Sequence, residues 1–241
     1  MTAVLPASLA EAIVQAQNAV RAAVASGIPR MTVEFVDPEL EAMPVAQQFY
    51  PVLQQMGLNF KVYFPDAGAA ALARRDWGNP DFVVRSPGER QGQMEADDQL
   101  YLFVEPSAIE VSQVEDLCNQ AGDRFVIMLN PRLEDVATIG IGYAGRQLRE
   151  RFLSTLQPVY YLRPIAGAVL WRAYPQTWQL WQETPETTHQ LLAEFDQKPS
   201  GETLDRVLMG QASLSNPEGP TRPRQGGLLG ELQSFLRALT Q

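Results

Sequence analysis

Two short, almost uninterrupted apolar runs constrain the fold of this chain more than any other feature of its sequence. Residues 100–104 and 125–129 both lack the polar alternation of a strand with one solvated face. Strands of this kind are buried on both faces, as in parallel sheets covered by helices. A helical pattern over 111–121 lies between the two runs. Since parallel neighbours need a right-handed crossover connection, we expect an α/β protein.

The same alternation of strand and helix extends over the first half of the chain. Ser8 and Glu11 form a capping-box pattern, and the apolar stripe that follows ends at Gly27. Further strands are predicted at 31–35, 60–64 and 82–85, and further helices at 44–57 and 67–75. The sequence therefore predicts a largely parallel sheet flanked by helices in a Rossmann-like, three-layer arrangement.

The pattern changes beyond residue 158. Runs at 159–162, 168–174 and 178–183 are too close together for helices between them, which predicts an antiparallel extension near 158–183. Polar helices are expected at about 187–195 and 202–209. We thus predict a single α/β domain over 1–210, a Pro/Gly-rich linker over 211–227, and a C-terminal amphipathic helix over 228–241 that packs on its own domain or on a partner.

Composition excludes several classes of function. Cys118 is the single cysteine and His189 the single histidine, which argues against disulfides, zinc sites and most nucleophile-histidine arrangements. We predict no metal and no cofactor. The net charge of −9 disfavours nucleic-acid binding. No apolar run is long enough to span a membrane and no signal-peptide pattern is visible, so we expect a cytoplasmic protein.

The segment 130–152 is the main candidate for a binding site. Residues 123–174 carry seven basic and four acidic side chains, against the acidic trend of the chain. An anion site is favoured where glycines, a helix N-terminus and cations coincide. The alternative is a network of ion pairs with Glu134, Asp135 and Glu150. The residues of the predicted site are Asn130, Gly140, Gly142, Gly145, Arg146, Arg149 and Arg151.

The three glycines formally match a dinucleotide-binding fingerprint, but their context does not. The turn begins ten residues after the strand ending at Leu129, and no acidic residue occurs about twenty positions further on. Asp66 is a separate candidate, because it follows a strand and precedes a helix at the edge where ligands of open sheets bind. A simpler role for Asp66 is to cap that helix. Asn130, before Pro131, is expected to form a turn.

Several strings of residues resemble a known family. The first is Val-Tyr-Phe-Pro-Asp-Ala-Gly-Ala-Ala-Ala-Leu-Ala-Arg-Arg-Asp-Trp at 62–77, and the others are 127–132, 140–152 and 160–164, the last leading to Tyr174, Pro175 and Trp178. They are similar to a family of unknown function found in cyanobacteria and plastids, and the resemblance covers most of residues 5–210. That family includes a chloroplast low-photosystem-II-accumulation factor and the C-terminal region of a plastid adenylate kinase.

The resemblance implies a non-enzymatic accessory protein of photosynthetic membrane assembly or maintenance, with photosystem II as the expected setting. It implies a protein partner, such as a photosystem subunit or a membrane insertion factor, and a location in the cytoplasm or peripheral to the thylakoid. Kinase activity is not implied, because the chain lacks a Gly-rich phosphate loop. The residues themselves leave one alternative, a phosphometabolite- or nucleotide-binding enzyme that uses 140–151 with Asp66 as the acid.

Overall fold

A single nine-stranded sheet runs through the protein, with the strand order β3-β2-β4-β5-β1-β6-β7-β8-β9. The computed structural model describes residues 5–89, 93–134, 143–184 and 189–215. The strands are β1 (Arg30–Phe35), β2 (Phe60–Tyr63), β3 (Val83–Arg85), β4 (Leu100–Val104), β5 (Phe125–Leu129), β6 (Gln157–Ile165), β7 (Ala168–Ala173), β8 (Trp178–Glu183) and β9 (His189–Phe195). The helices are α1 (Leu9–Ala25), α2 (Ala42–Phe49), α3 (Pro51–Gln55), α4 (Ala67–Asp76), α5 (Val111–Ala121), α7 (Tyr143–Arg151), the short 3₁₀ turn η2 (Leu153–Thr155) and α8 (Gly201–Ser215).

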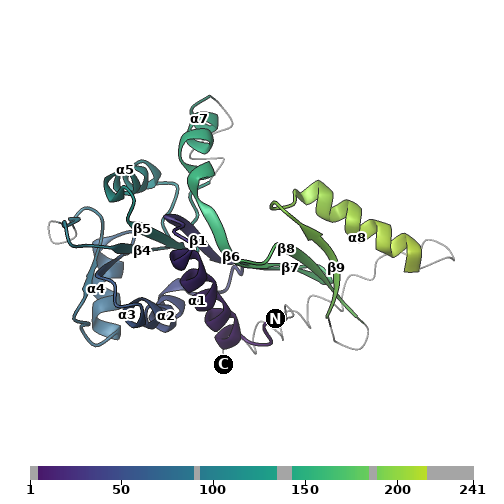
Figure 1. Cartoon of the computed structure of the whole chain (residues 1–241), viewed down its shortest axis with the longest axis horizontal. Helices are drawn as coiled ribbons and strands as arrows, with labels where there is room; N and C mark the ends of the chain where they lie inside the picture. Colours follow the sequence, from purple (N-terminus) through teal and green to yellow (C-terminus); the bar gives the residue numbers. More distant parts are fainter. Residues whose placement is uncertain (1–4, 90–92, 135–142, 185–188, 216–241) are drawn as a thin grey trace.

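The sheet changes direction at β6. Strand β1 pairs in parallel with both β5 and β6, and β2, β3 and β4 continue the parallel part. Strands β6 to β9 pair antiparallel with one another. Figure 1 shows helices on both sides of the parallel part and α8 over the antiparallel extension. The predicted α/β class and its antiparallel extension are confirmed.

Short-range hydrogen bonds fix where the helices begin. The Ser8 hydroxyl accepts from the backbone N–H of Glu11 at 3.2 Å, and the Glu11 carboxylate accepts from the N–H of Ala7 at 2.7 Å. Asp66 caps α4 in the same way, because its Oδ1 accepts from the N–H of Ala69 at 2.9 Å. These side chains replace partners that the first helical turn lacks.

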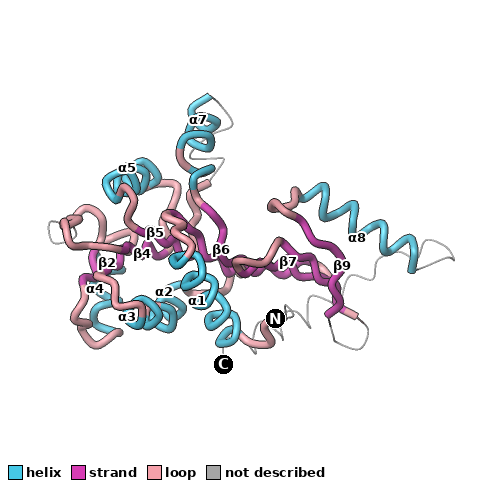
Figure 2. The backbone as a smooth tube through the Cα atoms, viewed as in Figure 1, coloured by secondary structure: helices cyan, strands magenta, loops and turns pink. Residues whose placement is uncertain are grey.

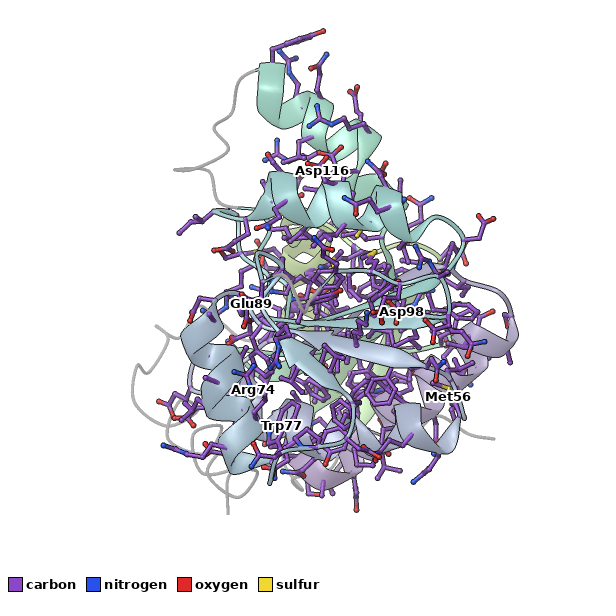
Figure 3. The ribbon with its side chains drawn as sticks, turned by 90° about the vertical axis from the view of Figure 1, so that its left-hand side faces the viewer. Met56, Arg74, Trp77, Glu89, Asp98 and Asp116 are labelled. Carbon is purple, nitrogen blue, oxygen red and sulfur yellow. The ribbon has the colours of Figure 1, made fainter. Side chains whose placement is uncertain are left out.

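Two hydrophobic layers cover the parallel part of the sheet. Helices α1 to α4 pack on one face, against side chains that include Val33, Val62 and Leu102. Helix α5 and the end of α7 pack on the other, against Tyr101 and Phe103 among others. Figure 3 shows the sheet between these layers, with Asp116 on α5 on one side and Arg74 and Trp77 of the α4 region on the other. A separate cluster lies between the extension and α8.

The predicted helix over 187–195 is wrong. Residues 189–195 form β9, the edge strand, which pairs with β8 from His189 to Phe195. The sequence there is rich in good helix formers such as Leu, Ala, Glu and Gln, so local propensity favoured a helix. Pairing with β8 and contact of Phe195 with the α8 cluster override that preference.

Two further predicted helices have different limits. The predicted helix 44–57 is divided into α2 and α3, because Pro51 has no N–H with which to continue the hydrogen-bond ladder. The last helix extends to Ser215, so the linker predicted from 211 does not begin before residue 216. The remainder of that linker and the predicted helix 228–241 lie outside the described residues. Among the described helices, none combines the length and apolarity needed to cross a bilayer.

Candidate functional site

The chain leaves two neighbouring strands toward opposite faces of the sheet. After β1 it continues to α2, which packs on one face, and after β5 it continues toward α7, whose end packs on the other. Figure 2 draws the described parts of these connections as loops. In open α/β sheets, such a switch point at the carboxyl ends of the strands is where ligands bind.

A groove with a volume of about 350 Å³ lies at this switch point. Among the described residues, its walls come from two segments, the end of β1 with the residues that follow it and the residues just beyond β5. The lining residues are Glu34, Phe35, Val36, Asp37, Pro38, Asn130, Pro131 and Arg132. The groove therefore combines three charged side chains with two prolines and apolar side chains, in one concave surface.

Asn130 joins the two walls. Its backbone N–H donates to the carbonyl of Val33 at 2.8 Å, and its Oδ1 accepts from the N–H of Phe35 at 2.7 Å. The residue has φ of 48°, a left-handed conformation that Asn tolerates better than most side chains. These two bonds offset the cost of that conformation. Within the described part of the chain Nδ2 has no partner, so it presents two donors to the groove.

The neighbouring strand ends in the same way. Glu105, directly after β4, also has φ of 48°, and its N–H donates to the carbonyl of Leu129 at 2.8 Å. Its carboxylate pairs with Arg132 at 3.0 Å. Left-handed backbone conformations cost about 1–2 kcal/mol for ordinary residues. Two of them, at the ends of the neighbouring strands β4 and β5, indicate that the backbone is constrained at this edge of the sheet.

The acid on the other wall, Glu34, is held by two side chains. Thr32 donates from Oγ1 to Glu34 Oε1 at 2.8 Å, and Lys198 Nζ lies 3.8 Å from Glu34 Oε2. Lys198 comes from the β9–α8 loop and stands 4.2 Å above the centre of the Tyr161 ring. The side chain of Glu34 is 19% exposed. A cation from the antiparallel extension thus pairs with an acid that lines the groove of the parallel part.

The predicted site on α7 has a different arrangement. Gly140 and Gly142 lie outside the described residues, and Gly145 is buried in α7. Arg149 pairs with Glu134 at 3.6 Å, as the ion-pair alternative expected. Arg146 is exposed and pairs with no acid of the described segments.

Arg151, the third predicted arginine, is bound to an acid on another helix. It makes two hydrogen bonds with Glu115 of α5, at 2.7 and 2.9 Å. These bonds from Arg151 hold the pKa of Glu115 below its usual value, although partial burial acts in the opposite direction. Two of the three arginines are therefore in ion pairs, and an anion site on α7 stays a prediction.

Of the predicted site residues that the structure describes, Asn130 alone lines the groove. Asp66 is exposed at the end of β2, where its Oδ1 is occupied by the capping bond, and it does not line the groove. Sequence reasoning missed Glu34, Asp37 and Arg132. They follow or end predicted strands, but the strand order, which places β1 beside β5, was needed to bring them together.

A second polar cluster lies at the opposite edge of the sheet, where β2 and β4 begin. Lys61 is only 3% exposed, and its Nζ lies 2.9 Å from Glu95 and 3.0 Å from Asp98. With Asp97, these two acids have the spacing of a metal site. The ammonium of Lys61 already pairs with two of the three acids, so we assign this cluster a structural role. Figure 3 labels Asp98 beside the sheet.

Fold and groove together define a doubly wound α/β protein with a switch-point groove and an antiparallel extension. The chain belongs to the family described as a domain of unknown function, DUF1995, whose model matches residues 6–206. The match begins just before α1 and ends within α8, so both walls of the groove and Lys198 lie inside it.

Proposed function

We propose that this protein is a non-catalytic accessory factor that binds a protein partner during the assembly or maintenance of photosynthetic membranes, with photosystem II as the setting. The groove between the ends of β1 and β5 is the observation that carries the proposal. At this groove the fold combines concavity, exposed apolar surface and charge.

The surface around the groove has the chemistry of a protein-binding site. Val36 is 38% exposed on one wall. Ile109 is 82% exposed in the loop after β4, and Ser107 of that loop forms a bridge with Arg132 of the other wall. Apolar side chains next to charged ones are typical of interfaces that form and dissociate. Because Pro38 and Pro131 restrict the backbone, less conformational entropy is lost when a partner binds.

The photosynthetic setting is proposed from the sequence resemblance. Two of the strings that carry it, 127–132 and 160–164, lie on β5 and β6 and lead to the same edge of the sheet as the groove. The expected location is the cytoplasm or the periphery of the thylakoid. A photosystem subunit or a membrane insertion factor is the kind of partner that the resemblance favours.

The test is affinity capture from detergent-solubilised photosynthetic membranes. We expect the wild-type chain to recover subunits of a membrane complex, and Val36→Ser/Arg132→Ala to recover far less. Asp123→Asn is a surface control, because Asp123 is exposed and precedes β5, whereas the groove wall follows the other end of that strand. Recovery of no membrane subunits by the wild type would contradict the function. Loss with Arg146→Glu/Arg149→Glu and full recovery with the groove variant would move the site to α7.

A further inference from the structure

We infer that the partner segment that fills the groove is basic and extended, a stretch of chain that carries lysine or arginine around an apolar residue. This inference rests on the proposed function and specifies the partner of the same site. It follows from the charges that remain unpaired around the groove.

Arg132, which lines the groove, and Lys198, which lies beside Glu34, are already paired with acids. Arg132 is bound to Glu105 at 3.0 Å, and Lys198 lies 3.8 Å from Glu34 and over the Tyr161 ring. An anionic ligand would have to compete with these acids for the same cations. The existing pairs therefore disfavour a phosphate or an acidic peptide as the occupant.

The acids that follow β1 have no such partners. Asp37 lines the groove, and Glu39 and Glu41 are exposed on the loop that continues from it. None of the three makes an ion pair with any residue in the described ranges. One exposed cation, Arg163 on β6, lies next to this wall, because Val36 donates to the carbonyl of Leu162. Three acids against one cation leave a negative rim, which attracts a basic segment.

The shape of the groove favours an extended segment. Its two walls are the ends of parallel strands joined by Asn130, and Val36 offers an exposed apolar contact beside Asp37. Side chains of an extended chain alternate in direction, so a lysine can reach Asp37 while its apolar neighbour contacts Val36. Loops of membrane proteins on the cytoplasmic side carry an excess of lysine and arginine. Such a loop has the required chemistry, whereas an anionic lipid surface would be repelled.

The experiment is fluorescence anisotropy with two labelled, unstructured peptides. One is rich in lysine with a central leucine, and the other has glutamate at each lysine position. We expect the wild-type chain to bind the basic peptide, more weakly as salt is added, and the acidic peptide not at all. The variant Asp37→Asn/Glu39→Gln/Glu41→Gln keeps side-chain shape and removes three charges, so we expect its affinity to fall about tenfold.

The matched control is Asp116→Asn/Asp123→Asn/Asp205→Asn, which removes the same charge from exposed positions outside the groove. We expect it to bind the basic peptide nearly as tightly as the wild type. An equal loss in both triple variants would reduce the effect to net charge and overturn the inference. Binding of the acidic peptide, or of anionic vesicles in preference to the basic peptide, would overturn it as well.

The outcomes of the peptide-binding experiment and of the capture experiment can be told apart. Recovery of membrane subunits by the wild type, without preference for the basic peptide, would refute the partner chemistry and leave the proposed function standing. Preference for the basic peptide with no membrane subunits recovered would refute the photosynthetic role and leave the chemistry of the groove standing.

Discussion

The parallel and antiparallel parts of the sheet differ in how completely they are covered. Every residue of β2 and β4 is buried between two helical layers, whereas every residue of β9 is half-buried or exposed. The parallel part derives its stability from burial on both faces. The extension is covered mainly on one face, by α8, and its strands pair with their neighbours in sequence.

The candidate site lies where these two parts meet. The parallel part provides both walls of the groove, and the extension provides Lys198, with Tyr161 and Trp178 beneath it. The doubly covered sheet therefore positions the groove, while a less buried region adjusts its charge. Four tests by substitution examine this division, in order of decreasing expected effect.

Truncation of equivalent leucines gives the largest effect and the most direct comparison. Leu102 on β4 and Leu180 on β8 are both 0% exposed. We expect Leu102→Ala to lower the free energy of unfolding by about 4 kcal/mol and Leu180→Ala by about 2.5 kcal/mol, because a cavity between two helical layers collapses less readily. Urea unfolding measures both. Equal losses would show that the two parts are packed equally well.

Replacing Lys61 tests the buried ion pair of the parallel part. We expect Lys61→Met to cost about 3 kcal/mol, since it leaves the buried Asp98 without its cation. Burial lowers the pKa of Lys61, but hydrogen bonds with Glu95 and Asp98 outweigh it and raise the pKa above 10.5. Its contribution is therefore complete below pH 10.5 and lost as pH rises through the folded-state value.

The pH dependence provides the control for this substitution. Burial also raises the pKa values of Tyr63 and Tyr101, because it disfavours their ionised form. The wild type and Lys61→Met therefore both lose stability in alkali. The difference in the free energy of unfolding between wild type and Lys61→Met isolates the contribution of the lysine. We expect this difference to become smaller above pH 10.5. Unfolding curves across the alkaline range would show this. A difference that is constant with pH would contradict the assigned role of the ammonium.

Lys198 connects the extension to the parallel part, and its loss has a moderate expected effect. The side chain is 46% exposed, so its contacts with Glu34 and Tyr161 are partly screened. We expect Lys198→Met to cost about 1 kcal/mol. Glu202→Gln, at an exposed position of α8, is a control with almost no expected effect. A loss as large as that of Lys61→Met would mean that Lys198 holds the two parts together.

Substitution on α7 has the smallest expected effect. Arg146 is exposed and pairs with no acid in the described ranges, so we expect Arg146→Glu to change stability by less than about 0.5 kcal/mol. We also expect nucleotides and sugar phosphates to leave the melting temperatures of the wild type and of Arg146→Glu unchanged. A rise of the wild-type value alone would favour the phosphate-binding alternative, since ligand at a hundredfold excess over its Kd stabilises by about 2.7 kcal/mol.

The elements of the parallel part were predictable because their signals are local. Ser8 and Asp66 mark helix starts through hydrogen bonds to residues three positions away. The apolar runs of β4 and β5 indicate strands that are buried on both faces. Prediction was wrong at β9, where helix formers occupy an edge strand. Of the groove, the sequence suggested Asn130, but only as a turn and as part of a site centred on α7.

The sequence by itself determined the class of this protein, an α/β fold with a parallel part and an antiparallel extension, because periodicity and capping depend on neighbours along the chain. The tertiary structure alone decided the strand order and hence the site. It placed β1 beside β5, brought Phe35 to Asn130, and brought Lys198 to Glu34. These contacts join residues far apart in sequence, where no local pattern records which partner will be adjacent.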